Sequence, residues 1–513
     1  MRNLGIPLTA LFICTGILQL VAQVDTNSSR YAASITESVL RAHLNVLAND
    51  SMEGRETGME GQRRAAAYIM GQFRSYGIPP ISDAVARGML PDGYQQRFPL
   101  TVDRLGGLSF SVDGTSHEFL KDYFYFSEQL VKDLEVNEVM VLAPVSLGGT
   151  RLGGSSKVVM LLDPHNPRSD IMDQVGQASS ALAKTGAKVL LVVQDSAENE
   201  MRHYGPILSR SRMRLGGGEA TKQAKEGLQI MFITPQLAQT ILDHGRLSLK
   251  KAYKTAAKKR VIVDVPVRFT TGPNSGRFTA ENVLGYVEGT DKPGEIVAVT
   301  AHYDHIGVID GEVYNGADDD GSGTAAVLAM AEAFAMAKAD GHGPRRSMLF
   351  MTVSGEEKGL LGSEWYTEHP VFPLDSTVAD LNIDMIGRTD TVYGDSSHYV
   401  YVIGSKRISK ELGDLVEREN RSWTHLDLDY TFDAANDPNR FYYRSDHYNF
   451  AKHGVPIAFF FNGVHADYHG PHDEVGKIRF DLLRQRALLV FHTAWVLANS
   501  EERLAKDGPD GVK

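Results

Sequence analysis

The chain has 513 residues, of which 42% are hydrophobic and 23% are charged, and its formal net charge is -11. This length predicts two or three domains, and the composition is typical of globular proteins rather than fibrous or disordered ones. The negative balance argues against a nucleic-acid-binding protein, because no basic stripe is available to neutralise phosphates.

The first 22 residues have the features of a secretory signal peptide. Arg2 is followed by an apolar run from Leu4 to Ala22 and then by polar sequence, which places cleavage at residue 22 or 23. An uncleaved anchor helix is the alternative, although the run barely spans a bilayer. A lipoprotein attached through Cys14 is disfavoured, because Ile13 stands where a small residue is needed. We therefore expect a secreted or periplasmic protein whose mature chain has no membrane span.

Two helices are predicted at the start of the mature chain. Residues 30–48 have apolar side chains spaced by three and four, which indicates an amphipathic helix. Residues 62–78 form a second helical run that ends at Gly77, a residue type typical of helix C-termini. On their own, these two helices indicate a structural role rather than a functional one.

The sequence changes in character from about residue 107 to residue 271. Short β-like runs alternate here with Gly-rich loops and one or two helices, and residues 158–193 indicate a β-α-β element inside a mainly β unit. The expected strands are 139–144, 157–163, 188–193, 229–235 and 260–270. No cluster of His, Asp and Glu with ligand spacing occurs in this segment. It is therefore predicted to be a cap or binding module rather than a second active site.

An alternation of strands and helices resumes at Asn282. The expected strands are 295–301, 347–354, 378–386, 399–405 and 456–462, and the expected helices are 323–339 with Ser322 as N-cap, 362–369, 409–420 and 480–499. Near-continuous apolar strands separated by helices predict an α/β domain with a mostly parallel, doubly covered sheet. The predicted organisation is a signal peptide at 1–22, a main domain formed by 23–110 and 273–513, and an inserted unit at 111–272.

Polar residues follow the ends of several predicted strands in the main domain or lie in the loops after them. They are, in chain order, His302, Asp304, His305, Asp318, Asp319, Asp320, Glu356, Glu357, Asp384 and His469. Open α/β folds place their active sites at the carboxyl edge of the sheet. We therefore expect imidazole and carboxylate groups from these segments to meet there.

This combination of residue types indicates a metal site. A buried carboxylate such as Asp384, which lies inside an apolar run, needs a strong partner. A backbone hydrogen bond would explain one such residue, but not several that reach the same edge. Cys14 is the only cysteine and precedes the expected cleavage site, so nitrogen and oxygen must hold the ion, which is most often zinc in an extracellular hydrolase. Two ions would share one carboxylate, and one member of the Glu356–Glu357 pair could bind metal while the other accepts a proton from water.

The motifs resemble those of the M28 family of zinc peptidases, in particular secreted bacterial members with a protease-associated (PA) domain inserted in the catalytic domain. The matching segments are 54–69, 299–307, 315–333, 353–366, 381–388, 445–461 and 467–474, the last of which reads DYHGPHDE. They cover the main domain nearly end to end. The likeness to a PA domain rests only on the alternation of short β-like runs with Gly-rich loops and on the position of this segment. The resemblance implies a phosphorylase/hydrolase-like α/β fold with an inserted, mainly β PA domain.

The resemblance also implies metal ligands, residue by residue. One zinc ion is expected at His302 and Asp384, and a second at Glu357 and His469. Asp319 is expected to bridge the two ions. In this family the peptide bond after the bridging Asp is often cis.

Three further residues receive roles from the resemblance. Glu356 matches the general base of the family. Asp304 is similar to the carboxylate that orients the imidazole of the first ligand, as metal-bound histidines generally require. Tyr468 matches a position where some relatives have a tyrosine that hydrogen-bonds the tetrahedral oxyanion.

Some of these assignments compete with neighbouring residues. His305 is an alternative to His302, and His472 is an alternative to His469, although the register YHxPxD favours His469. The two carboxylates that flank Asp319 are expected to make turn hydrogen bonds near the start of the following helix rather than to bind metal.

The predicted function is a secreted di-zinc aminopeptidase that acts on peptide substrates. A carboxypeptidase is the main alternative, because some relatives use arginine-rich pockets and Arg388, Arg440 and Arg444 could form one here. Glutaminyl cyclases share the fold but lack the first histidine, whereas His302 is present. Receptor-like relatives lack the metal ligands that this sequence retains. The oligomeric state and the preferred side chain do not follow from the sequence.

Overall fold

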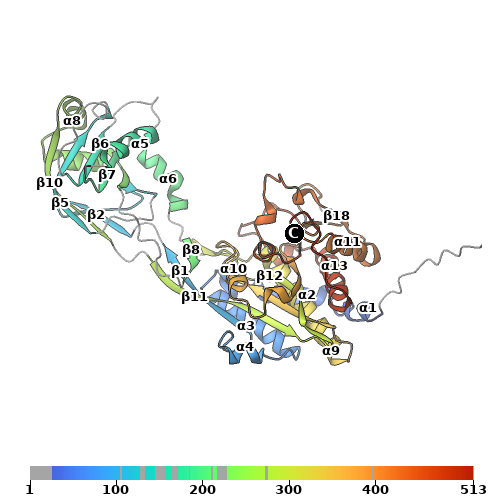
Figure 1. Ribbon diagram of the computed structural model, residues 1–513. Coiled ribbons are helices and arrows are strands. Elements are labelled where there is room, and N and C mark those ends of the chain that lie inside the picture. The colour runs from blue at the N-terminus through green and yellow to red at the C-terminus, as the bar shows by residue number, and fades with distance from the viewer. Residues whose placement is uncertain are drawn as a thin grey trace, which may run out of the picture.

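The computed structural model describes residues 26–103, 107–126, 133–144, 156–162, 171–183, 185–208, 212–216, 228–271, 275–394 and 397–511. The predicted signal peptide and Cys14 lie outside these residues. Over the described ranges, no helix combines the length and apolar character that a membrane crossing requires. The described elements form two larger sheets, each with its own helices, and a small two-stranded sheet (Figure 1).

The first sheet has nine strands, eight from the segments predicted as the main domain and one, β8, from within the predicted insertion 111–272. Its order is β18 (Asp427–Asp429), β17 (Tyr399–Ile403), β19 (Ile457–Phe461), β16 (Thr377–Ile383), β12 (Lys292–His302), β15 (Arg346–Val353), β11 (Ser275–Val287), β1 (Gln95–Asp103) and β8 (Arg212–Leu215). The four central strands β19, β16, β12 and β15 are parallel, whereas β11, β1 and β8 add antiparallel strands on one side. The sheet is therefore mixed, and its parallel part is the centre.

Helices cover both faces of this sheet, as the near-continuous apolar strands predict. Consecutive side chains of β15 alternate between the faces: Phe350 joins the core under one layer of helices, and Leu349 and Met351 join the other. The first layer contains α1 (Thr26–Ala32), α2 (Glu37–Leu47), α3 (Glu60–Ser75), α9 (Gly323–Ala339), α11 (Lys410–Glu419) and α13 (Phe480–Asn499). The second contains α4 (Ser82–Ala86), α10 (Leu361–Glu368) and α12 (His447–Ala451). We call this sheet and its helices the main unit.

The predicted helix over 30–48 is two helices, α1 and α2. The Thr36 side chain accepts a hydrogen bond from the backbone N–H of Val39, so it caps α2 and separates it from α1. The second predicted helix is α3, and Gly77 follows its end with a φ of 76°, the left-handed conformation that favours glycine.

The second sheet has eight strands and runs from β2 to β10. Its order is β3 (Thr115–His117), β2 (Leu108–Val112), β10 (Val261–Thr271), β5 (Leu134–Leu142), β6 (Val158–Leu162), β7 (Val189–Val193), β9 (Gln229–Ile233) and β4 (Tyr123–Phe124). The strands β5, β6, β7 and β9 are parallel. We call this sheet and its helices the inserted unit, because its strands all lie between β1 and β11 in the chain (Figure 1). Among the described residues of this stretch, only β8 returns to the sheet of the main unit, where it pairs with β1.

Four helices are described in the inserted unit, where one or two were expected. They are α5 (Ile171–Leu182), α6 (Ala197–Leu208), α7 (Pro235–Asp243) and α8 (Leu249–Ala256). The helices α7 and α8 pack on one face of its sheet, and α5 and α6 pack on the other. Each unit thus buries its own hydrophobic core.

Candidate metal centre

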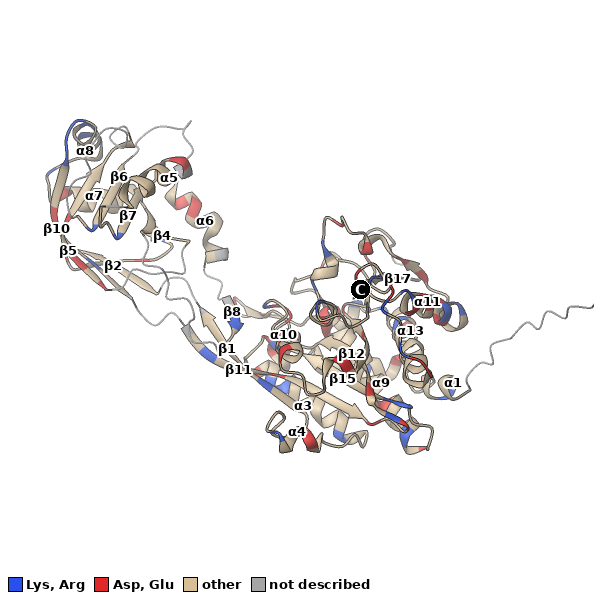
Figure 2. Ribbon diagram, in the orientation of Figure 1, with Lys and Arg blue, Asp and Glu red and all other residues tan. Residues whose placement is uncertain are grey.

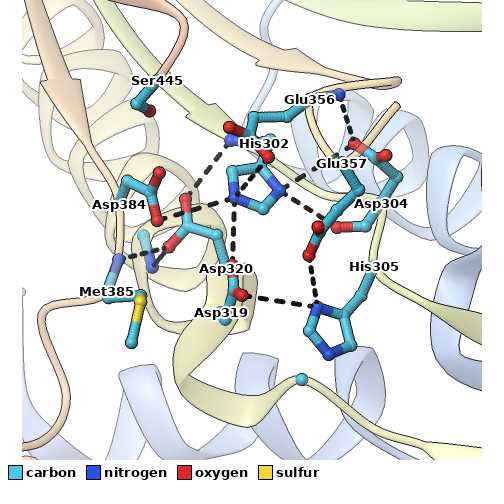
Figure 3. A network of polar contacts seen from close by, with 12 residues as sticks. His302, Asp304, His305, Asp319, Asp320, Glu356, Glu357, Asp384, Met385 and Ser445 are labelled. Carbon is cyan, nitrogen blue, oxygen red and sulfur yellow. Dashed lines mark hydrogen bonds and ion pairs between the residues drawn. The ribbon is translucent and has the colours of Figure 1, made fainter. Parts of the chain in front are cut away.

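The chemistry-bearing residues lie where the central parallel strands of the main unit end. His302 is the last residue of β12, Asp384 directly follows β16, and Glu356 and Glu357 lie in the turn after β15. His469 comes from the loop that follows β19. Because these four strands are neighbours and run in the same direction, their carboxyl ends bring the side chains to one edge of the sheet (Figure 3).

A first group of side chains surrounds the Nε2 atom of His302. This atom lies 3.2 Å from Asp319 Oδ1, 3.5 Å from Asp384 Oδ1 and 3.9 Å from Glu356 Oε2. The His302 side chain is 1% exposed, so bulk solvent screens these charges only weakly. His302, Glu356 and Asp384 are placed closely enough to hold one metal ion.

A second group lies on the other side of Asp319. Glu357 Oε1 is 3.0 Å from His305 Nδ1, and Glu357 Oε2 is 3.1 Å from His469 Nε2. Asp319 Oδ2 is 3.3 Å from His469 Nε2 and 3.8 Å from His305 Nδ1. Asp319 therefore presents one carboxylate oxygen to each group, the arrangement that the sequence predicts for a bridging ligand.

Several of these buried atoms have no hydrogen-bond partner among the described residues. They are His302 Nε2, His305 Nδ1, Asp319 Oδ2 and Glu357 Oε1. A buried polar atom without a partner costs free energy, and a cation between nitrogen and oxygen ligands removes that cost. Ligand atoms at zinc–ligand distances of 2.0–2.2 Å in a tetrahedron lie roughly 3.3–3.6 Å apart, close to the separations within both groups. The residues present therefore fit zinc.

The Nδ1 atom of His302 is oriented by Asp304, but through the backbone. It lies 3.0 Å from the Asp304 carbonyl oxygen, which can only accept, so Nδ1 carries the proton and the Nε2 lone pair faces the carboxylates. The Asp304 carboxylate, expected to do this, is 3.8 Å from Nδ1. It accepts hydrogen bonds from Thr57 Oγ1 at 2.6 Å and from the Glu356 backbone N–H at 3.2 Å instead. It thus connects the first group to the turn that carries Glu356.

The residues that flank Asp319 bind backbone groups, as expected. Asp320 accepts hydrogen bonds from the N–H groups of His302, Gly323 and Met385, and Asp318 accepts one from Gly387. The peptide bond between Asp319 and Asp320 is cis, as the family resemblance implies.

Ser322 directly precedes α9 as predicted, but its side chain does not cap the helix. Ser322 already has helical backbone angles, and its hydroxyl donates to the carbonyl of Asp318. The Asp320 carboxylate accepts the hydrogen bond from the Gly323 N–H instead. A six-residue π-helical segment, η3 (Ala317–Ser322), precedes α9 and moves the capping role back to Asp320.

Two supporting residues were not predicted. Arg55 is fully buried and donates to the carbonyl oxygens of Leu47, Tyr303, Asn315 and Gly316. These hydrogen bonds connect α2, which contains Leu47, to the segment of Tyr303 and to the segment of Asn315 and Gly316, on both sides of the second group. Its sequence signal was the position of Arg55 in the matching segment 54–69.

The second supporting residue is Asp473, whose carboxylate accepts hydrogen bonds from the backbone N–H groups of Asp318 and Asp319. These bonds fix the backbone of Asp319. Its sequence signal was the final acidic position of the YHxPxD register.

The electrostatic environment separates the two glutamates. Burial raises the pKa of Glu356 well above its usual range, and the charges of Glu357 and Asp384 add to this effect while His302 opposes it. Burial and Asp319 also raise the pKa of Glu357, but contacts with His305 and His469 outweigh them and hold this pKa at about 2. Glu356 thus accepts protons readily, whereas Glu357 remains an ionised carboxylate.

A cavity opens beside the first group. Its lining consists of Asp319, Glu356, Asp384, Met385, Phe441, Arg444, Phe459, Phe461, Val464 and Tyr468. The Tyr468 ring stacks on His469 with the ring centres 3.9 Å apart, and its hydroxyl lies 3.4 Å from Arg444 Nη2. The lining thus combines carboxylates with aromatic rings.

The competing residues fall in different places. His472 is exposed, whereas His469 contacts both Asp319 and Glu357, so the geometry favours His469. His305 does not replace His302 but lies in the second group. Of the three arginines considered for a carboxylate pocket, Arg444 lines the cavity, whereas Arg388 forms an ion pair with Asp467 at 3.0 Å.

Arg440, the third of these arginines, lines a separate cavity and lies over the ring of Tyr443. It is therefore not part of the lining beside the first group.

The fold and the site together define an α/β protein with two candidate metal positions at the carboxyl ends of parallel strands. Residues 282–494 match the sequence model of Peptidase family M28. The matched residues are similar to peptidase family M28 and make up less than half of the chain.

Individual proteins are similar over parts of the chain. Aminopeptidase YwaD of Bacillus subtilis is 27% identical over 242 residues, which are 44% of this chain and 46% of the relative. A probable leucine aminopeptidase of Arthroderma benhamiae is 31% identical over 215 residues, which are 40% of this chain and 55% of the relative. The chain thus spans about half the length of these curated relatives. Among solved structures, an aminopeptidase from Aneurinibacillus sp. strain AM-1 has a TM-score of 0.49 and 18% identity, covering 94% of this chain and 98% of the neighbour.

Proposed function

We propose that this protein is a zinc-dependent exopeptidase that removes residues from the N-terminus of peptides. The observation that carries the proposal is the position of Asp319, with one oxygen toward each of two groups of buried imidazole and carboxylate ligands. His302 and Asp384 would hold one zinc ion, Glu357 and His469 the other, and Asp319 would bridge them. Relatives named aminopeptidase and zinc metalloprotease support both the ion and the activity.

Glu356 is the proposed general base. A zinc pair supplies Lewis-acid activation of water and of the scissile carbonyl. Glu356 Oε2 lies 3.9 Å from His302 Nε2, beside the first metal position, and the raised pKa of Glu356 suits a group that accepts a proton and returns it to the leaving amine. Its backbone N–H is held by Asp304, which keeps the carboxylate beside the two groups.

The cavity beside the first group would receive the N-terminal residue. Glu356 and Asp384 offer carboxylates to a protonated α-amino group, and Met385, Phe459 and Phe461 offer apolar contacts to its side chain. Tyr468 lines the same cavity and is the proposed hydrogen-bond donor to the developing oxyanion, because burial and the surrounding carboxylates raise the pKa of its hydroxyl and keep it protonated.

Export of the protein and the identity of the inserted unit belong to the same proposal. The apolar N-terminal run supports secretion or periplasmic location of the mature chain. The inserted unit, assigned to residues 111–272, would be a PA-like module, which its position between β1 and β11 supports.

Metal analysis and a substrate panel test this function. We expect two zinc ions per purified chain, together with hydrolysis of aminoacyl arylamides and no hydrolysis of N-blocked peptides with free C-termini. Fewer than two zinc ions would contradict the two-metal site. Cleavage of the N-blocked peptides alone would instead support a carboxypeptidase, for which Arg444 in the cavity lining is the candidate carboxylate-binding residue.

A further inference from the structure

His305 lies in the second group in the same way as a metal ligand would. Its side chain is fully buried, and its Nδ1 atom lies 3.0 Å from Glu357 Oε1 and 3.8 Å from Asp319 Oδ2 (Figure 3). His305, Asp319 and Glu357 are close enough together to hold one ion. We propose that His305 Nδ1 is a fourth protein ligand of the second metal ion, beside Asp319, Glu357 and His469. This inference rests on the two-metal function proposed above.

The alternative is that His305 only positions Glu357 through a hydrogen bond. The contact between Nδ1 and Glu357 Oε1 is short, but neither atom has a partner with hydrogen-bond geometry among the described residues. His302 Nε2 likewise lies close to Asp319, at 3.2 Å from its Oδ1 atom, but has no hydrogen-bond partner among the described residues. Two atoms that face a common point rather than each other are arranged as co-ligands, so the geometry favours metal binding over positioning.

The backbone holds the imidazole of His305 in this place. Its N–H donates to the carbonyl of Arg55, and the residue pairs with Glu56 as an isolated β-bridge. Gly316 packs against the ring: a Cβ atom at this position would lie 2.4 Å from His305 Cγ, and its φ of 54° also favours glycine. A ring that is fixed before the ion binds loses little entropy on coordination.

Four protein ligands at the second position would make the two positions unequal. The first position has His302, Asp384 and the shared Asp319, which leaves room for water or substrate beside Glu356. Closed zinc sites with four protein ligands are typical of structural ions, whereas catalytic ions keep an open position. The second ion would therefore be held more tightly, and the first would be the exchangeable ion that faces the cavity.

Chelator titration of zinc from the whole protein tests this inference. For the wild-type protein we expect two classes of zinc that differ in affinity. The changes His305→Ala and His305→Gln should each weaken the tighter class by at least about tenfold, since loss of even an outer partner of a metal ligand typically costs that much. The matched control is His492→Gln, another buried histidine of the main unit, which should leave both classes unchanged.

The glutamine variant separates coordination from positioning. Its side-chain amide keeps an N–H donor for Glu357 but is a poor zinc ligand, so wild-type affinity in His305→Gln would overturn the inference. Crystals of the zinc-loaded protein provide a second readout: Nδ1 at 2.0–2.1 Å from the ion, the usual zinc–histidine distance, would support coordination. A distance beyond about 3 Å would overturn it. If the wild type binds a single zinc ion, the two-metal function fails, and the distance from that ion to His305 still decides the role of this residue.

Discussion

The two units of this protein are built on the same kind of sheet but hold charge in different places. In each unit, neighbouring parallel strands of apolar residues lie between two layers of helices. Among the described residues of the inserted unit, the buried polar side chains are uncharged: Ser156, Gln174, Gln229 and Thr234. The main unit instead buries titratable groups at the carboxyl edge of its sheet, including His302, Asp304, His305, Asp319 and Asp384.

The lysines of the inserted unit show the other way to place charge. Lys250, Lys251 and Lys254 lie on the exposed side of α8, where water solvates them (Figure 2). Burial of a charge costs free energy unless a partner compensates it. A sheet whose buried residues serve only packing therefore keeps charged side chains on its surface. The comparison teaches that the parallel framework alone does not indicate function. The buried ionisable groups at one edge do, because their burial costs free energy that a partner must compensate.

The largest expected effect is the loss of turnover in Glu356→Gln. The amide cannot accept the proton of the attacking water, whereas the proposed metal ligands remain, so kcat should fall by roughly 10²–10⁴-fold with two zinc ions still bound. Steady-state kinetics and metal analysis measure the two quantities. The control is Gln194→Ala, which changes the residue after β7 in the inserted unit and should leave kcat unchanged. Undiminished kcat in Glu356→Gln would contradict the role of this residue as base.

A pair of core substitutions compares the two sheets directly. Leu191 in β7 and Leu381 in β16 are both fully buried in parallel strands, so replacement of either by alanine should destabilise the protein by about 2–5 kcal/mol. Leu381→Ala should also weaken zinc binding, because Asp384 follows on the same strand, whereas Leu191→Ala should not. Urea unfolding and chelator titration measure both effects. Weaker zinc binding in Leu191→Ala would show that the two units are coupled.

Much of this contrast can be predicted from the sequence, because it depends on local patterns. The strands that carry His302 and Asp384 are recognisable as apolar runs, and the bridging role expected for Asp319 comes from motifs that resemble a known family. The side of Asp319 on which His305 lies could not be predicted. It depends on the path of the segment from His305 to Gly316, which the carbonyl contacts of Arg55 fix across the fold.

The capping hydrogen bond of α9 differs from the prediction for a related reason. Ser322 is a suitable capping residue by type, but the π-helical segment before α9 places it inside the helical backbone and gives the capping hydrogen bond to Asp320. A local residue preference cannot reveal that segment, because it depends on contacts of Asp320 with β12 and with the residue after Asp384.

Arg55 tests how far the metal centre depends on its support. In Arg55→Lys the planar fork that serves four carbonyl groups is lost, so we expect zinc affinity to fall by about 10–100-fold. Arg346→Lys is the matched control: Arg346 is also fully buried, but it begins β15, at the end of the strand opposite to the turn with Glu356, and donates to carbonyl groups at and after the end of α13. Both variants should lose stability in thermal unfolding. Equal zinc affinities in the two variants would contradict a specific role for Arg55.

The smallest expected effect is a dependence of main-unit stability on pH. Burial lowers the pKa of His492 to about 4, and its ring stacks on Trp423 and contacts the Ser28 hydroxyl. The unfolded chain takes up a proton near the ordinary pKa of 6.5 whereas the folded chain does not, so the contribution of neutral His492 is complete above this pH and is lost as pH falls toward 4. Between pH 7 and 5.5 this residue should cost about 1 kcal/mol of stability.

The measurement that isolates this effect is urea unfolding at both pH values. His492→Gln should reduce the pH dependence by that amount, because glutamine does not titrate. The exposed His244 of the inserted unit provides the control, since His244→Gln should leave the dependence as it is in the wild type. An unchanged pH dependence in His492→Gln would mean that protonation of the metal ligands, rather than of this core histidine, causes the acid sensitivity of the main unit.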